Sequence, residues 1–225
     1  MKKHYRIKFL ILATVVLFCI LYTGYKAFFY FDGIAEQKEI KRNEGISRLT
    51  EKELSQIAEG DIILRRGFGF FSDYIAKNLN DTLIDVTHAG IIVNRDGALH
   101  VIHSLSSDVS PIDGLQIQPI GEFLKHSEPG KIMVTRIKNS NSDTASNIAK
   151  LAQGYLEQHV PFDHNGDFDD GSKLFCTELI WRILEKDLHH TLIPLEITAR
   201  KDFFYSMAPM YDTRYFDIVI NQYSH

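Results

Sequence analysis

The alternation of apolar and polar residues divides most of the chain into short strands and helices. Short runs rich in Ile, Val and Leu, bounded by Gly, Asn and Asp, are typical of strands. Such runs occur at residues 60–64, 86–93, 98–105, 132–137 and 216–220. Apolar residues recur at helical spacing over 142–158 and 176–188, and Ser72 is the expected N-cap of a shorter helix over 72–79. The pattern predicts an α+β domain with an antiparallel sheet packed against helices, and a loop over 106–121.

The N-terminus follows a different pattern, with a basic head followed by an uncharged, apolar stretch. The apolar residues run from Phe9 to Tyr22 and, extended to Tyr25, give a span of 17 residues, just enough to cross a bilayer. A cleaved signal peptide needs small residues before its cut site, and none is well placed after Tyr22. Phe18 is also too bulky to precede a lipid-modified Cys19. We therefore expect an uncleaved signal anchor in the inner membrane, with the head in the cytoplasm and the domain outside, in the periplasm.

The segment after this anchor is highly charged. Residues 32–57 predict a linker that runs into a short helix, because Thr50 and Glu53 have the spacing of a capping box. The chain is thus expected to comprise an anchor over 1–31, a linker with a short helix over 32–57, and one folded domain over 58–225.

Charge and composition narrow the function. Hydrophobic residues make up 44% of the chain and charged residues 24%, which is typical of a globular protein with one sizeable core. The first 30 residues hold five basic and no acidic residues, so the folded part is acidic. Nucleic acid is an unexpected partner, because its recognition needs clustered Lys and Arg.

Two of the predicted strands carry a histidine on the same face. Asn94–Gly97 joins strands 86–93 and 98–105 and is a strong hairpin signal. If the loop is residues 94–97 or 95–96, His88 lies directly opposite His103. If residues 96 and 97 form a two-residue turn, His103 is diagonal to His88. Both registers put the two imidazoles on one face of the sheet.

The only cysteine outside the apolar N-terminal segment is Cys176, which follows a turn-rich loop and begins a helical pattern. Neither a disulfide within the domain nor a cysteine-rich zinc site is expected from two cysteines placed in this way. A thiol in the first turn of a helix faces unpaired N–H groups that stabilise a thiolate. The alternative is that Cys176 is a small buried apolar residue, as lone cysteines often are.

Together these residues predict nucleophilic acyl transfer. His88 accepts the thiol proton, Cys176 attacks a carbonyl, and His103 orients the His88 ring. Other chemistries lack their motifs: the chain has no His-Glu-x-x-His zinc signature, no Gly-x-Ser-x-Gly elbow and no phosphate-binding loop. The acidic run 163–169 has Phe168 where a calcium loop requires Gly, so a solvated turn is expected. We predict no metal and no cofactor.

Four motifs in order carry a family resemblance. They are Gly60-Asp-Ile-Ile63, Thr87-His-Ala-Gly-Ile-Ile92, Pro161-Phe-Asp163 and Phe175-Cys-Thr-Glu-Leu179. Over residues 58–205 the chain resembles the circularly permuted, NlpC-type papain-fold hydrolases of the YiiX/YaeF-like group, in which histidine precedes cysteine. The resemblance implies a permuted papain-like fold, with Cys176 as nucleophile, His88 as base and His103 as orienting residue. Many relatives have Glu near the third position and Ser after the cysteine, where this chain has His103 and Thr177.

The resemblance implies cleavage of an amide or ester. NlpC-type enzymes cleave peptide bonds in cell-wall peptides, and the related lecithin:retinol acyltransferases act on lipid acyl groups. The predicted tether favours a membrane-anchored thiol hydrolase of cell-envelope amide bonds, with a wall peptide as its substrate. Aromatic segments at 68–71 and 203–205 favour the alternative of a lipid acyl hydrolase or acyltransferase. A catalytically silent module that holds an envelope ligand in the same groove is the rival. The pattern does not predict an oligomeric state.

Overall fold

A computed structural model describes residues 2–79, 84–167, 171–189 and 206–223. The aromatic segment 203–205 lies outside these residues. Six antiparallel strands form one sheet in the order β4-β3-β2-β1-β5-β6. The strands are β1 (Ile62–Gly67), β2 (His88–Arg95), β3 (Ala98–Leu105), β4 (Gly114–Pro119), β5 (Ser127–Ile137) and β6 (Phe216–Asn221).

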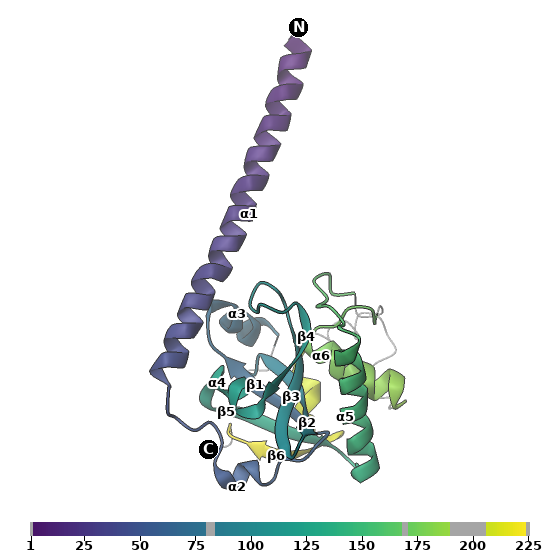
Figure 1. Cartoon of the computed structure of the whole chain (residues 1–225). Coiled ribbons are helices and arrows are strands. Elements are labelled where there is room, and N and C mark those ends of the chain that lie inside the picture. Colours follow the sequence, from purple (N-terminus) through teal and green to yellow (C-terminus); the bar gives the residue numbers. More distant parts are fainter. Residues whose placement is uncertain (1, 80–83, 168–170, 190–205, 224–225) are drawn as a thin grey trace.

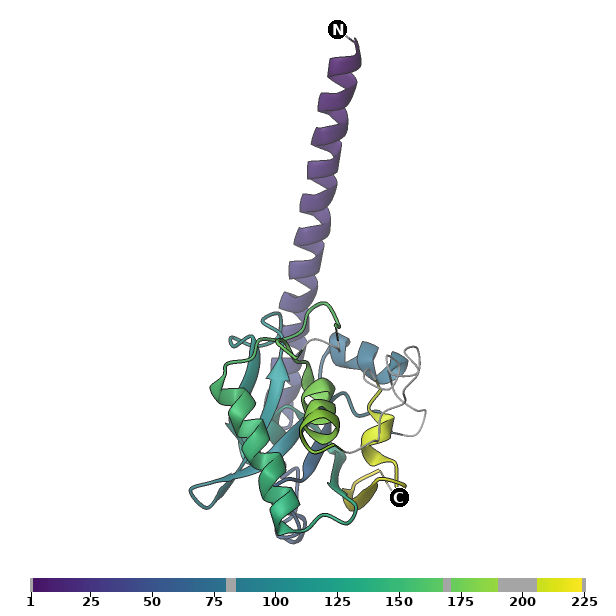
Figure 2. The same ribbon diagram turned by 90° about the vertical axis from the view of Figure 1, so that its right-hand side faces the viewer.

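Helices cover both faces of this sheet. The α-helices are α1 (Lys2–Arg42), α2 (Glu51–Leu54), α3 (Phe70–Asn78), α4 (Ile120–Lys125), α5 (Ser142–Glu157) and α6 (Cys176–Trp181). A π-helical segment, Arg182–Asp187, continues α6, and a 3₁₀ turn, Ala208–Tyr211, precedes β6. Figure 2 shows α5 and α6 on the same face of the sheet.

The core has two parts because strand side chains alternate between the two faces. Ile62 and Leu64 of β1 pack into a large cluster with residues of α5 and α6, including the fully buried Trp181. Ile63 points the other way, into a smaller cluster with Phe123 of α4. The predicted α+β class, antiparallel sheet and covering helices are confirmed.

The β2–β3 hairpin adopts the second of the two predicted registers. Arg95 pairs with Ala98, so residues 96 and 97 form a two-residue turn. Both have positive φ, 53° for Asp96 and 80° for Gly97, as a type I′ turn requires. His88 and His103 are therefore diagonal neighbours and not directly opposed.

Two expectations about local structure were wrong. The segment 106–121 is not all loop, because Gly114–Pro119 forms the edge strand β4 beside β3. Helix α3 begins at Phe70, two residues before the predicted cap, and its N-cap is Gly69 with φ 92°. The hydroxyl of Ser72 instead hydrogen-bonds that of Thr87 at 2.7 Å and ties α3 to the start of β2.

Helix α1 is long and apolar enough to cross a membrane. It does not end with the apolar stretch but continues through Arg42, into the segment expected to be linker. Its C-terminal part packs on the domain, while its N-terminal part projects away from it (Figure 1). The ring of Phe29 meets that of Phe71 in α3 edge to face, with centroids 5.5 Å apart. The predicted capping box of α2 is present: Thr50 and Glu53 bond each other's backbone N–H groups.

Candidate active site

Two buried histidines meet where β2 and β3 lie side by side. The Nε2 atom of His88 is 2.9 Å from the Nδ1 atom of His103, a hydrogen-bond distance. The rings are nearly perpendicular, at 82°, and both pack against the ring of Phe123. Gly90 makes this approach possible, since a Cβ there would lie 3.3 Å from the Cβ of His103 and only 2.4 Å from Val101.

This pairing decides which nitrogen of His88 is available for proton transfer. One of the two bonded nitrogens must carry the hydrogen. If His88 donates from Nε2, its Nδ1 keeps a free lone pair and acts as a base. If His103 donates instead, His88 carries its hydrogen on Nδ1 and cannot accept a proton there. Only an acceptor at position 103 selects the basic form of His88.

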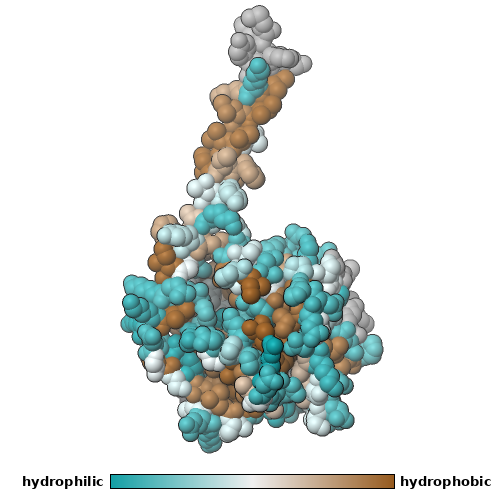
Figure 3. All heavy atoms as spheres, viewed as in Figure 1, coloured by the Kyte–Doolittle hydropathy of each residue, from teal (hydrophilic) through white to brown (hydrophobic). Residues whose placement is uncertain are grey.

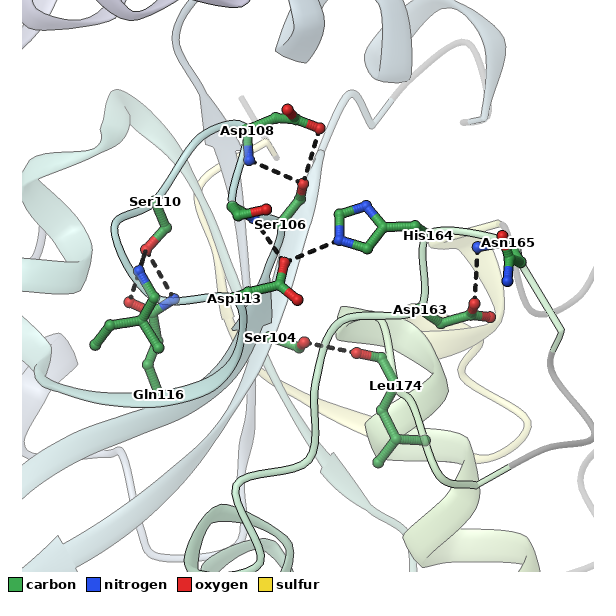
Figure 4. Close-up of polar contacts among 12 residues, drawn as sticks. Ser104, Ser106, Asp108, Ser110, Asp113, Gln116, Asp163, His164, Asn165 and Leu174 are labelled. Carbon is green, nitrogen blue, oxygen red and sulfur yellow. Dashed lines mark hydrogen bonds and ion pairs between the residues drawn. The ribbon is translucent and has the colours of Figure 1, made fainter.

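Cys176 is the first residue of α6, as the sequence predicted. Glu178, two residues on, accepts the N–H of Phe175 at 3.2 Å and so caps the helix start. The hydroxyl of Ser104 on β3 donates to the carbonyl of Leu174 at 2.6 Å and fixes the loop that delivers Cys176 to the sheet (Figure 4). Glu178 has a structural role here, because it is fully buried and bonds the helix cap; burial also raises its pKa to about 8.

Burial favours the neutral forms of both reacting groups. Burial raises the pKa of the Cys176 thiol, although the N–H groups of Ala89 and Thr177 favour its thiolate. Burial also lowers the pKa of His88 well below its usual value, and that of His103 to about 3. The described contacts of Cys176 and His88 include no hydrogen bond between them. These directions favour a neutral pair, in which the thiol passes its proton to His88 as the sulfur attacks.

The site also contains a buried arginine, which sequence reasoning missed and whose positive charge acts on both Cys176 and His88. Arg65 on β1 is 6% exposed, lies 4.8 Å over the ring of Phe123 and donates to the carbonyl of His126. Its positive charge favours the Cys176 thiolate and disfavours a charged His88. Burial lowers its own pKa to about 10, so it stays charged at neutral pH. Its signal was a pair of arginines, Arg65-Arg66, inside an apolar strand.

Strand β2, which carries His88, and helix α6, which begins with Cys176, border one cavity of about 310 Å³. His88, Cys176 and Arg65 line it, and the described walls are otherwise mainly apolar. Helix α1 supplies part of the wall through Asp32 and Glu36. Asp32 is 6% exposed and accepts the N–H of Phe71 at 3.0 Å, while Glu36 pairs with His126 at 3.0 Å. No pattern in the sequence indicates that these two residues reach the site.

Polar contacts hold the rim of this cavity together. Asp113, before β4, accepts the N–H of Ser107 at 2.8 Å and lies 2.9 Å from Nε2 of His164. Figure 4 shows how this joins the loop after β3 to the loop before α6. Asp163, which lines the cavity, accepts the N–H of Asn165 at 2.8 Å. The rim is therefore a connected structure and not two independent loops.

Comparison with known proteins identifies the family of this chain. Residues 56–213 match the model of the permuted papain-like amidases, the YaeF/YiiX or C92 family, so the chain belongs to that family. The predicted circularly permuted papain-like fold is confirmed. A similar solved structure is the metalloprotein YiiX from Escherichia coli O157:H7, with a TM-score of 0.56 and 19% identity over 74% of this chain and 98% of that one. No curated protein matches.

The name of that neighbour raises the question of a metal here. In the part of the chain that the structure describes, no group of three or more His, Cys, Asp or Glu side chains is placed to hold a metal ion. The structure brings the predicted residues together: His88 and Cys176 line one cavity, and His103 lies within hydrogen-bond distance of His88.

Proposed function

We propose that this protein is a membrane-anchored cysteine hydrolase that cleaves an amide bond in a cell-envelope substrate. The observation that carries the proposal is one cavity lined by both Cys176 and His88, with His103 bonded to His88, in a chain of an amidase family. Helix α1 would be the anchor, with its basic end in the cytoplasm and the domain on the other side of the membrane.

The reaction begins with the neutral pair. The Cys176 thiol gives its proton to Nδ1 of His88 while the sulfur attacks the carbonyl carbon of the substrate. The imidazolium that forms is stabilised by the acceptor nitrogen of His103. Arg65 and the nearby backbone N–H groups stabilise the negative charge on sulfur and on the tetrahedral oxygen.

Collapse of the tetrahedral intermediate breaks the C–N bond. His88 returns its proton to the leaving nitrogen, and the acyl group stays on sulfur as a thioester. Water then attacks the thioester, His88 accepts a proton from it, and the free acid and the thiol are restored. A cell-wall peptide is a suitable substrate for a domain tethered outside the membrane.

An activated ester tests this proposal without knowledge of the natural substrate. p-Nitrophenyl acetate, given to the full chain in detergent, should release a burst of p-nitrophenolate followed by turnover, which reports an acyl-enzyme. Cys176→Ala should abolish the burst, and His88→Ala should slow it by roughly 100-fold or more near neutral pH. His100→Ala, a partly exposed histidine on β3, is the matched control and should behave as the wild type.

The pH dependence separates the enzyme from a silent module. The deficit of His88→Ala should shrink as the pH rises, because an ionised thiol no longer needs a base. A wild-type protein with no burst, or with one that His88→Ala leaves unchanged near neutral pH, would overturn the proposal in favour of a binding module.

A further inference from the structure

An ion pair holds one loop of the domain at the end of the apolar stretch of α1. Lys26, directly after that stretch, bonds Asp108 at 3.0 Å, and the Tyr25 hydroxyl donates to the same carboxylate. Asp108 lies in the loop 106–113, between β3 and β4. This loop is on the side of the domain that faces the projecting half of α1 (Figure 1).

Helix α3 contacts α1 a short way further along its axis. The ring of Phe71 packs on that of Phe29, and the N–H of Phe71 bonds Asp32. Because an α-helix rises about 1.5 Å per residue, Phe29 and Asp32 lie about 4.5 and 9 Å beyond Lys26. The headgroup layer beside a hydrocarbon core is about 5–8 Å thick. With α1 across a bilayer, α3 therefore lies at the level of this layer.

The apolar stretch is slightly short for the hydrocarbon core. Its 17 residues rise about 25 Å, whereas the core is about 30 Å thick. A short span draws the residues that flank it into the boundary between lipid and water. Here these residues include Phe28, Tyr30 and Phe31, which are exposed on α1, and aromatic rings are favoured at that boundary. The shortfall moves α3 and the loop closer to the lipid.

Helix α3 and the loop expose apolar side chains at this level. Phe70 and Tyr74 are four residues apart, so they share a face of α3, and they are 54% and 60% exposed. Val109 and Ile112 of the loop are 38% and 55% exposed. Tyr74 and Val109 border the same cavity, so the two elements are neighbours. These four side chains form an apolar patch, and Figure 3 shows hydrophobic residues over the projecting part of α1 and again where it meets the domain.

The carboxylates of α3 and the loop do not oppose contact with lipid. Each has a basic partner: Lys26 for Asp108, Arg66 for Asp73 and His164 for Asp113. A paired charge loses less hydration free energy near lipid than a free one does. The composition of the patch therefore suits a place between lipid and water better than one in bulk water.

We propose that this patch is a second membrane contact of the protein, seated in the headgroup layer of the bilayer that α1 crosses. Its partner is the lipid surface itself. The inference goes beyond the proposed function and shares only its anchor. The family match covers residues 56–213 and leaves α1 out, so the arrangement of span and patch is a property of this chain. Together the two contacts hold the domain in one orientation on the membrane.

Nitroxide labels on single cysteines test the inference in phosphatidylethanolamine–phosphatidylglycerol vesicles. Their collisions with oxygen, which concentrates in lipid, are compared with those with a nickel chelate, which stays in water. The full chain with Cys19→Ala and Cys176→Ala has no thiol, and it receives Phe70→Cys, Tyr74→Cys or Ile112→Cys, one at a time.

Ile46→Cys is the matched control. Ile46 is an exposed isoleucine like Ile112, at 50%, but it follows the end of α1 at Arg42, which is roughly 24 Å beyond Lys26 along the helix. Cys176→Ala alone leaves the native Cys19, which is exposed within the apolar stretch, and a label there reports whether α1 enters the lipid.

We expect the labels at positions 70, 74 and 112 to collide with the nickel chelate about five times less often than the label at position 46, because they lie in the headgroup layer. Their collisions with oxygen should be at least as frequent as at position 46. Nickel collisions as frequent at the patch as at position 46 would overturn the inference. Labels shielded from both reagents would also overturn it, since they would be covered by protein.

The label on Cys19 separates failure of the patch from failure of the anchor. If it meets oxygen and not nickel while the patch labels meet nickel freely, α1 is a span, the patch is not a membrane contact and the proposed function stands. If the Cys19 label meets nickel as often as the label at position 46 does, the anchor and the inference both fail.

Discussion

Replacing His103 tests whether an acceptor beside His88 activates the thiol. His103→Leu and His103→Asn are similar in size, but only Asn has a hydrogen-bond acceptor: its Oδ1 stands at the branch position of the histidine Nδ1. The bond to be replaced is 2.9 Å long and joins two buried rings. Before proton transfer this bond joins two neutral rings. After proton transfer His88 is charged and His103 still accepts its hydrogen.

The size of the effect follows from this change of charge. A hydrogen bond contributes about 0.5–1.5 kcal/mol between neutral groups and about 1.5–3 kcal/mol to a charged one. The difference of about 1–1.5 kcal/mol acts only after proton transfer and corresponds to a factor of roughly 5–13 in rate. Loss of tautomer selection adds a factor of about two, so His103→Leu should slow acylation by roughly 10- to 25-fold.

The measurement is the rate of the p-nitrophenyl acetate burst near neutral pH. His103→Asn should keep the rate within about threefold of the wild type, because it supplies an acceptor and no competing hydrogen on that atom. The melting temperature of each variant shows that it is folded. Equal rates for His103→Leu and the wild type, or a His103→Asn variant as slow as the folded His103→Leu, would refute the reasoning.

Three further outcomes are expected. Arg65→Met should raise the pKa of Cys176 further and move the alkaline limb of its iodoacetamide profile to higher pH, whereas Arg65→Lys, which keeps the charge, should move it less. Burial raises the pKa of Glu178 from 4.5 to about 8, so the folded state holds this proton more tightly and stability falls as the pH rises through that window. In thermal melts, the advantage of Glu178→Gln over the wild type should therefore grow from pH 5 to pH 8. Asp32→Ala should free the N–H of Phe71 and speed alkylation of Cys176 by bulky maleimides relative to iodoacetamide; Asp32→Asn, which keeps an acceptor, should not.

The histidine pair was predictable because strand side chains have a period of two. The alternative hairpin registers differ by an even step, so His88 and His103 share a face in each, and their proximity did not depend on the turn. The position of Cys176 was predictable for a similar reason: turn formers before it and apolar helical spacing after it define a helix start without any tertiary contact. Local periodicity was sufficient for these residues.

Burial of charge could not be predicted in the same way. Arg65 is covered by Phe123 and bonded to His126, about 60 residues away, and no local pattern reports that contact. Strand β4 did leave a signal, since Leu115 and Ile117 alternate with Gln, but the Pro and Gly around them masked it. The burial of Cys176, which raises the pKa of its thiol, could not be predicted either, because the helix start indicates its N–H neighbours and not the depth of the cavity.

Because α1 continues beyond the apolar stretch, its residues Asp32 and Glu36 are part of the cavity wall and belong to the domain that contains the site. Charged residues after a membrane span are usually a solvated linker, but here Asp32 is buried and Glu36 bonds His126. A charged side chain is buried only where partners compensate its lost hydration, and for Asp32 that partner is the N–H of Phe71. Helix α1 and the cavity therefore constrain each other. A soluble version that begins after Arg42 would lose one wall, so its selectivity would not represent that of the whole chain.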